Sequence, residues 1–340
     1  MSALDVTFLN NVTREHFVEG LRNQLYDEMP MLKMIVNNGV EDAVGRSLIW
    51  DVVLARNQAN GQVAGYDEMV TQEANLVTQA SLSWADYYYA NVSISQTELS
   101  RNSGTKEKLV SMLETKMAAA KSTLKEKVYA DLWLALTARG SYATIVGFAA
   151  VCDLDNTYAG ILRTTAGNEG WQSNTYEVAV TADEAKDPTS GAKYLPTLMR
   201  TQLKNTSHDG MATVIVTTPT IYEIYEFIAE THNLRFGNGG VDLGFNSAKM
   251  TSQTSKNAGK TATVYWDKYA TASKIYYLNP DTWKSFIFPG ANFEPADVLG
   301  TGIWQRGSKQ LAAYMTIVWS GQVLCLVPRE NAVATNVAAT

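Results

Sequence analysis

The sequence is short of the residue types that most catalytic and metal sites use. Its 340 residues include two cysteines, Cys152 and Cys325, and three histidines, His16, His208 and His232. Two cysteines so far apart form neither a CxxC-type metal site nor a disulfide framework, and they fit a reducing compartment. No two histidines have the i, i+4 spacing of a metal-binding helix. We therefore expect no catalytic residue, no cofactor and no metal site in this chain.

Charge is also sparse. Charged residues make up 18% of the chain and the formal net charge is −6, whereas an ordinary soluble domain has roughly 25% charged residues. No long run of Lys and Arg is present, which argues against a dedicated nucleic-acid-binding protein, because such proteins need a basic patch to displace counterions from phosphate. A surface with little charge suggests that partners cover much of it.

Long apolar runs are missing as well. No stretch approaches the ~18 apolar residues of a membrane-spanning helix, and the start MSALDVTFLNNVTREHF lacks the apolar core of a secretory signal. We expect a soluble protein made in the cytoplasm.

What is present is a clear order of elements. A helix is predicted from Thr13 to Pro30. Residues 47–56, SLIWDVVLAR, alternate apolar and polar side chains, and residues 81–95, SLSWADYYYANVSIS, are rich in aromatic and β-branched residues. We expect these two runs to pair as a long hairpin with residues 57–80 as its tip. An isolated two-stranded ribbon is marginally stable in water, so something must cover it.

The strongest periodic signal follows the hairpin. Apolar residues recur at three- and four-residue steps, which predicts a helix over residues 105–138, about 50 Å long at 1.5 Å per residue. Residues 141–190 read as loop-rich. Then come a helix near 193–205, a buried strand at 211–217 and a helix starting at Pro219.

The C-terminal third is rich in strands. The runs TATVYW, SKIYYL and KSFIF each predict a strand. In the closing run YMTIVWSGQVLCLVPRENAV, Gly321 lies between two apolar segments, and we expect a turn or bulge there. Together these elements predict an α+β protein.

Four stretches imitate functional motifs. The run Ser-His-Asp at 207–209 holds triad residue types, but a triad needs them to converge from separate elements. Asp153 and Asp155 could form a metal-binding pair, yet beside an asparagine they are better explained as turn formers. The glycine-rich run 237–244 lacks the Lys-Ser/Thr of a phosphate loop, and the tyrosines at 87–89 lack interleaved cations for base stacking. We expect structural roles for all four.

Three stretches in order carry a resemblance to a known family. They are ELSRNSGTKEKLVSMLETKMAAA before the long helix, TYAGILRTTAGNEGW after it, and VWSGQVLCLVPRENAVATNV at the end. With the arm, the hairpin and the α+β unit, they resemble the major capsid proteins of tailed bacteriophages, which have the Hong Kong 97-like fold. The order of parts covers essentially the whole chain. Family members commonly have a second glycine where this chain has Ala159, and often an Asp where it has Leu162, so the local turn geometry is left open.

The resemblance implies a division into parts and a set of structural anchors. The parts are an N-terminal arm (1–45), an extended E-loop (46–104), a P-domain with its spine helix and following loops (105–189), an A-domain (190–290) and closing strands shared by the P- and A-domains (291–340). The expected anchors for folding and assembly are Trp50, Trp84, Leu113, Leu124, Tyr158, Arg163, Trp171 and Gly321.

The resemblance also implies a function. Copies of the chain would assemble as pentamers and hexamers into an icosahedral head that encloses double-stranded DNA by weak, non-specific contact, with portal, scaffolding and decoration proteins as further partners. Two alternatives stay open: an encapsulin-type shell around a cargo enzyme, and a soluble α+β hydrolase using Asp153, Asp155 or His208. Some members of the fold cross-link through an E-loop lysine, but residues 47–105 contain no lysine. We therefore expect a shell without covalent links.

Overall fold

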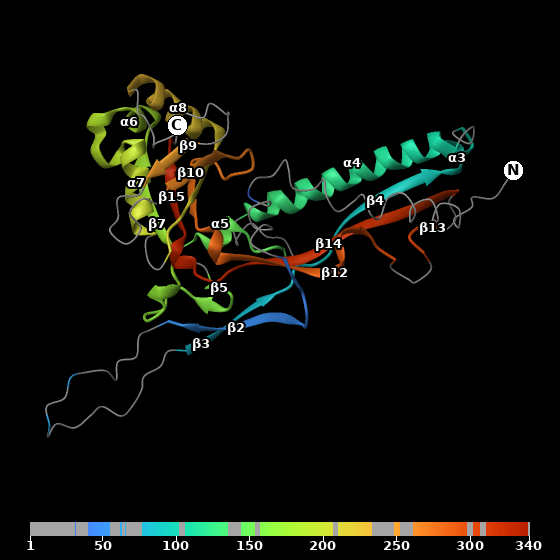
Figure 1. Cartoon of the computed structure of the whole chain (residues 1–340), viewed down its shortest axis with the longest axis horizontal. Coiled ribbons are helices and arrows are strands. Elements are labelled where there is room, and N and C mark those ends of the chain that lie inside the picture. Colours follow the sequence, from blue (N-terminus) through green and yellow to red (C-terminus); the bar gives the residue numbers. More distant parts are fainter. Residues whose placement is uncertain are drawn as a thin grey trace.

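The structure is a computed structural model with three connected parts. An elongated unit has one long helix lying along a sheet, a second unit combines a six-stranded sheet with helices, and a two-stranded hairpin lies below the body (Figure 1). The helix expected between Thr13 and Pro30 lies outside the described residues. These are 31, 40–54, 62, 65, 77–101, 106–134, 144–153, 157–206, 210–232, 248–251, 261–297, 302–306 and 311–338.

The sheet of the elongated unit is built around one central strand. Its strands are β1 (Val40–Asp42), β4 (Tyr88–Ser95), β12 (Trp283–Pro295), β13 (Gln305–Arg306) and β14 (Ala312–Cys325). Strands β12 and β13 pair along one edge of β14 and β4 pairs along the other, all antiparallel, while β1 adds to β12 in parallel. Alternate residues of β14 are therefore available to a single core beneath the sheet.

The long helix α4 (Lys106–Leu132) supplies the other side of that core. Leu113, Leu124 and Leu132 are buried together with Met315 of β14, so the apolar stripe predicted from the sequence does face inward. The helix has 27 residues, which makes it about 40 Å long. It is shorter than the predicted 105–138. It ends at Leu132, where the Trp133 ring turns into the core and packs 4.9 Å from the ring of Phe148 in α5 (Phe148–Val151).

The hairpin pairs differently from the prediction. Strand β2 (Ser47–Val53) pairs with β3 (Val77–Ser83), whereas β4 leaves the hairpin and joins β14. The predicted single strand 81–95 is thus wrong, because the chain breaks at Trp84. The Trp84 indole donates a hydrogen bond to the Gly45 carbonyl at 2.9 Å and packs edge-on against Phe288 at 4.9 Å. This contact holds the base of the hairpin against β12.

Of the turn or bulge predicted at Gly321, the turn is wrong and the bulge lies beside it on the partner strand. Gly321 lies inside the continuous strand β14 and pairs with Ile287 of β12. The irregularity falls on the partner strand, where the register shifts between Ile287 and Asn292. A Cβ at position 321 would collide with the carbonyl oxygen of Phe286. Glycine is required there because the two backbones approach closely, not because the chain turns.

The six-stranded unit contains the helices predicted in the middle of the chain. Its sheet order is β7 (Asn174–Val180), β15 (Ala332–Val337), β11 (Ile275–Leu278), β8 (Val214–Thr217), β10 (Thr261–Trp266) and β9 (Ala248–Thr251). Helices α7 (Leu195–Asn205) and α8 (Pro219–His232) are confirmed close to their predicted starts, and Ile221, Ile224, Tyr225 and Ile228 form the buried face of α8.

The region read as loop-rich holds more regular structure than predicted. It contains strand β7, helix α6 (Ala182–Lys186) and the 3-10 turn η4 (Pro188–Lys193). Strand β7 runs parallel to β15, so its partner comes from the far end of the sequence. Among the helices of the described residues, none combines the length and the apolar character that crossing a bilayer requires.

Candidate functional site

Residues 157–171, the stretch TYAGILRTTAGNEGW, form a platform beside the hairpin. Two short strands, β5 (Thr157–Tyr158) and β6 (Ile161–Leu162), flank a turn in which Ala159 and Gly160 have φ values of 51° and 80°. The left-handed conformation costs an alanine roughly 1–2 kcal/mol, so the contacts around the turn hold Ala159 in it against strain. The Ala159 carbonyl accepts a hydrogen bond from the Ser81 N–H at 2.9 Å, which joins the platform to β3.

An aromatic stack fills the space between platform and hairpin. Trp171, at the end of the 3-10 turn η3 (Glu169–Trp171), stacks on Tyr158 with ring centroids 5.6 Å apart and lies 6.4 Å from Trp50 of β2. Its indole N–H donates to the Tyr158 carbonyl at 3.2 Å. Trp171 and Tyr158 are buried. The stack therefore fixes the hairpin at a defined angle to the body.

The Tyr158 hydroxyl completes an open sheet edge. Strand β4 pairs with β14 only as far as Trp319, so among the described residues the end of β14 has no neighbouring strand on that side. There the Tyr158 hydroxyl donates to the Cys325 carbonyl at 3.0 Å and accepts from the Cys325 N–H at 2.9 Å. Gln322 acts similarly: its side-chain oxygen accepts from the Val323 N–H of the same strand at 3.2 Å, as well as from the Val146 N–H at 2.7 Å. Side chains thus replace the missing strand.

Arg163 lies fully buried beneath the platform. Its guanidinium is 5.2 Å from the centre of the Tyr158 ring, and Nη1 donates to the Asp153 carbonyl. The Arg163 carbonyl accepts from Gln172 at 2.6 Å. Burial lowers the pKa of Arg163, yet a guanidinium stays protonated in proteins. Its Nε and Nη2 atoms have no hydrogen-bond partner among the described residues.

The predicted anchors thus fall into two groups. The structure gathers Trp50, Tyr158, Arg163 and Trp171 around the foot of the hairpin. The remaining four lie elsewhere: Trp84 at the base of the hairpin on β12, Leu113 and Leu124 in the core under α4, and Gly321 within β14.

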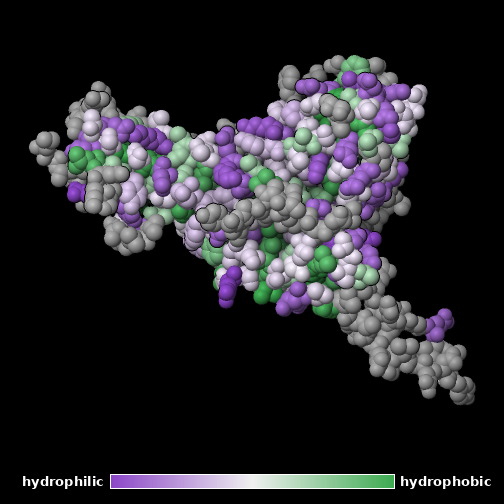
Figure 2. Space-filling view, turned by 180° about the vertical axis from the view of Figure 1, so that it is seen from behind, coloured by the Kyte–Doolittle hydropathy of each residue, from purple (hydrophilic) through white to green (hydrophobic). Residues whose placement is uncertain are grey.

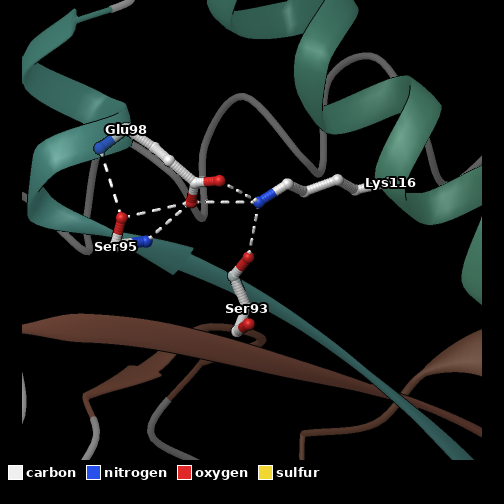
Figure 3. Close-up of polar contacts among 4 residues, drawn as sticks. All are labelled: Ser93, Ser95, Glu98 and Lys116. Atoms are coloured by element: carbon white, nitrogen blue, oxygen red, sulfur yellow. Dashed lines mark hydrogen bonds and ion pairs between the residues drawn. The ribbon is translucent and has the colours of Figure 1, made fainter.

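A second polar cluster closes the far end of the elongated unit (Figure 3). Ser95 and Glu98 form a capping box at the start of α3 (Gln96–Arg101): Glu98 accepts from the Ser95 N–H at 3.0 Å and the Ser95 hydroxyl accepts from the Glu98 N–H at 3.2 Å. Lys116 of α4 donates to Glu98 at 2.9 Å and to the Ser93 carbonyl at 3.0 Å. These bonds, led by the one from the Ser95 backbone, lower the pKa of Glu98. The cluster ties α4 to the end of β4.

A third cluster, which the sequence did not single out, joins the two sheet units. Glu330, in the 3-10 turn η6 (Pro328–Glu330), accepts from the Gly210 N–H and from the Asn279 amide, both at 2.6 Å. The Asn331 amide oxygen accepts from the Asn279 N–H at 3.0 Å. All four residues are far apart in sequence except Glu330 and Asn331. The closing run VPRENAV contains Glu330 and Asn331, but nothing in this run of sequence indicates that these polar side chains are buried.

A buried contact also links α4 to the six-stranded unit. Tyr129 of α4 donates its hydroxyl proton to the Asp267 carboxylate in the turn after β10. Asp267 accepts a further hydrogen bond from the Tyr269 N–H at 2.8 Å. Burial raises the pKa of Asp267 and of Tyr129. This contact and the Glu330 cluster both help to attach the six-stranded unit to the elongated unit.

The motif-like stretches show no assembled reactive site in the described part of the chain. The run 207–209, Asp155 and the run 237–244 lie outside the described residues. The backbone carbonyl of Asp153 accepts hydrogen bonds from the side chains of Arg163 and Ser173, which fixes it to the platform. Within the described ranges, no three His, Cys, Asp or Glu side chains come together as a metal site. Both cysteines are buried free thiols, and burial raises the pKa of Cys325 to about 12.

The outer face of the hairpin carries three exposed apolar side chains beside polar ones such as Asp51 and Gln79. Ile49, Val53 and Val77 are 57%, 71% and 53% exposed, and Val53 pairs directly with Val77 across the strands. Their neighbours Trp50 and Val52 point to the platform side and are half-buried. Figure 2 shows apolar surface, in green, at the lower edge of the body where the hairpin lies. Tyr87 and Tyr89 are exposed as well.

Comparison with known proteins identifies the fold. No protein-family model and no curated protein matches the sequence. The capsid asymmetric unit of cyanophage A-1(L) covers 94% of this chain and 95% of its own, with a TM-score of 0.60 and 19% identity. The capsid of Myoviridae phage XM1 covers 89% of this chain and 91% of its own (TM-score 0.51, 10% identity). A structure from Mycobacterium phage Adephagia covers 89% and 88% (TM-score 0.50, 7% identity).

These matches confirm the predicted fold class. The chain has the α+β, Hong Kong 97-like fold that these phage capsid structures share, and the likeness extends over nearly its whole length. At identities below a fifth, the likeness concerns the fold and leaves the function to be argued from the surface.

Proposed function

We propose that this chain is the major capsid protein of a tailed bacteriophage, which assembles as pentamers and hexamers into an icosahedral head around double-stranded DNA. The observation that carries this proposal is the hairpin. One of its faces is fixed to the body by the Trp50–Trp171 contact, while the other exposes Ile49, Val53 and Val77 to solvent. A monomer gains nothing from exposing these three apolar side chains to water, whereas a ring of subunits covers each hairpin with the next copy.

The division into parts follows the same proposal. We assign residues 1–45 to an N-terminal arm, 46–104 to the E-loop, 105–189 to the P-domain, 190–290 to the A-domain and 291–340 to the closing strands. In this assignment the platform and its anchors Tyr158, Arg163 and Trp171 set the angle of the E-loop. The role of the site is therefore mechanical, with no catalysis and no cofactor.

The net charge of the chain bears on what the proposed shell encloses. A net charge of −6 allows the shell to enclose DNA through weak, non-specific contact without retaining it. Portal, scaffolding and decoration proteins would be the other partners, and the assembled virion the final location, after synthesis in the bacterial cytoplasm.

Electron microscopy of the purified protein, alone and with its scaffolding partner, tests the proposal. We expect closed shells or rings of five and six subunits. Protein that stays monomeric at every concentration and ionic strength, even with its phage partners, would refute it. Shells that hold a protein cargo in place of DNA would identify the encapsulin-type alternative.

A pair of variants tests the hairpin directly. Val53→Asp with Val77→Asp places two carboxylates on the exposed face, so the subunit should fold normally by circular dichroism yet form no stable shell. The matched control, Val53→Ile with Val77→Ile, keeps the face apolar and should assemble. Normal assembly of the aspartate variant would show that this face is not an interface.

A further inference from the structure

One face of the sheet in the elongated unit is left uncovered. Side chains on the inner face of β4 and β14, such as Val92 and Met315, are buried in the core with Leu113 of α4. The opposite face, which we call the outer sheet face, consists of three residues from each strand, paired across it: Tyr89 with Val318, Asn91 with Thr316, and Ser93 with Tyr314. Tyr89 is 66% exposed and Tyr314 is 37% exposed. No charged side chain stands among these six residues, so apolar side chains can pack on this face without burying a charge of the sheet.

Most polar groups of the outer sheet face are already paired with one another. The Thr316 hydroxyl donates to Asn91 Oδ1 at 2.8 Å, and the Tyr314 hydroxyl donates to Gln305 of β13 at 2.9 Å. Polar groups that have partners lose less when water is removed from them. The Tyr89 hydroxyl and the Asn91 amide N–H groups make no hydrogen bond with any described residue. The outer sheet face therefore suits a partner that is largely apolar and carries a hydrogen-bond acceptor beside its apolar groups.

The outer face of the hairpin has this composition. Along β2, Asp51 stands between the exposed side chains of Ile49 and Val53, and Val77 of β3 pairs with Val53. The Asp51 carboxylate is exposed and makes no hydrogen bond or ion pair with any described residue. A surface that covers the three apolar side chains also removes water from this carboxylate, which is unfavourable unless donors replace the water. The hairpin therefore needs a receiving surface that provides donors.

Within one copy the two faces do not cover each other, since Asp51 and Tyr89 are both exposed. We infer that the outer face of the hairpin packs on the outer sheet face of a second copy of this chain, where the Asp51 carboxylate accepts hydrogen bonds from the Tyr89 hydroxyl and the Asn91 amide. Two antiparallel sheets pack in this way at a separation of about 10 Å. A contact between two different faces of identical subunits is heterologous and closes into rings. This inference rests on the proposed capsid function and adds to it the surface that receives each hairpin.

A single added charge tests the receiving surface. In Asn91→Asp the new carboxylate can still accept from Thr316, but it replaces a donor to Asp51 with a like charge. The protein concentration needed for assembly should rise by about tenfold or more. The matched control, Asn205→Asp, alters an exposed asparagine at the end of α7 and should assemble like the wild type. Unassembled Asn91→Asp subunits should keep the circular dichroism of the wild type, because the contact forms only between copies.

Exchange of the two groups identifies the occupant. Asp51→Asn combined with Asn91→Asp moves the carboxylate to the other side of the contact, and it should recover most of the wild-type assembly. A second measurement uses Asp51→Cys with Asn91→Cys, which should form disulfides between subunits in oxidised particles and give a ladder of multimers on a non-reducing gel. The native Cys152 and Cys325 are buried and should not take part. The control, Asp51→Cys with Asn205→Cys, should run at the monomer mass.

Each outcome bears on a different part of the inference. Normal assembly of Asn91→Asp, or an equal loss with Asn205→Asp, overturns the receiving surface. A defect that the exchange does not repair, or particles of Asp51→Cys with Asn91→Cys that give no ladder, overturns the hairpin as the occupant. A wild-type protein that forms no shells refutes the proposed function instead.

Discussion

Replacing Tyr158 by phenylalanine removes a single oxygen atom from the platform and leaves the aromatic stack in place. That oxygen makes two hydrogen bonds to the Cys325 backbone, at 2.9 and 3.0 Å. Cys325 is fully buried, and β4 does not reach this end of β14, so no strand of the described residues can replace these two hydrogen bonds. A buried backbone group that loses its partner costs about 1–3 kcal/mol. With two such groups, we expect Tyr158→Phe to lower the free energy of unfolding by about 2–4 kcal/mol.

A second buried tyrosine provides the control. Tyr277 of β11 is as deeply buried as Tyr158, but its hydroxyl has no hydrogen-bond partner among the described residues. Tyr277→Phe removes the same atom without breaking a bond, so the stability should stay the same or rise slightly. Urea denaturation of unassembled subunits measures both changes, and hydrogen exchange at the Cys325 amide should accelerate only in Tyr158→Phe. A change below about 0.5 kcal/mol for Tyr158→Phe, or an equal loss for Tyr277→Phe, would refute the reasoning.

Three further predictions concern other parts of the chain. Glu98→Gln removes the ion pair with Lys116. Because the pKa of Glu98 is lowered in the folded state, the carboxylate stabilises the fold above its ordinary pKa of 4.5, and this stabilisation is lost as the pH falls through the lowered pKa. The melting temperatures of variant and wild type should therefore differ near neutral pH and converge in acid. Gly321→Ala should cost about 1–3 kcal/mol in thermal unfolding, because its Cβ meets the Phe286 carbonyl, and an unchanged melting temperature would contradict the close approach. Since residues 47–105 contain no lysine, boiled particles should run at the monomer mass of 37.3 kDa on a denaturing gel, and a ladder of multimers would disprove a non-covalent shell.

Elements with a strong local period were predictable. The apolar stripe of α4 and the Thr-Pro start of α8 mark helices whatever lies around them, and both helices are found. The end of α4 was less predictable, because the apolar pattern continues past Leu132 in the sequence. The Trp133 ring packs against Phe148 and Tyr276, at 4.9 and 5.1 Å, and these residues come from other elements. Only the packed structure shows that the helix stops there.

The functional site was predictable in part. The stretch 157–171 was expected to have a structural role, and its Tyr158, Arg163 and Trp171 do come together at the hairpin. Glu330 was missed, since a charged residue in a closing loop gives no sign of whether it is buried or exposed. The structure buries Glu330 between Gly210 and Asn279.

The sequence by itself determined the local conformations and the chemistry that is missing: where helices and strands form, which side of each is apolar, and that no lysine lies in residues 47–105. Only the tertiary structure decided which strands are neighbours. Alternation along β2 shows that one face is buried, but it is equally compatible with β3 or β4 as a partner, because pairing depends on residues distant in the chain. The same applies to Gly321, which reads as a turn in sequence and is required by the backbone of β12 passing beside it.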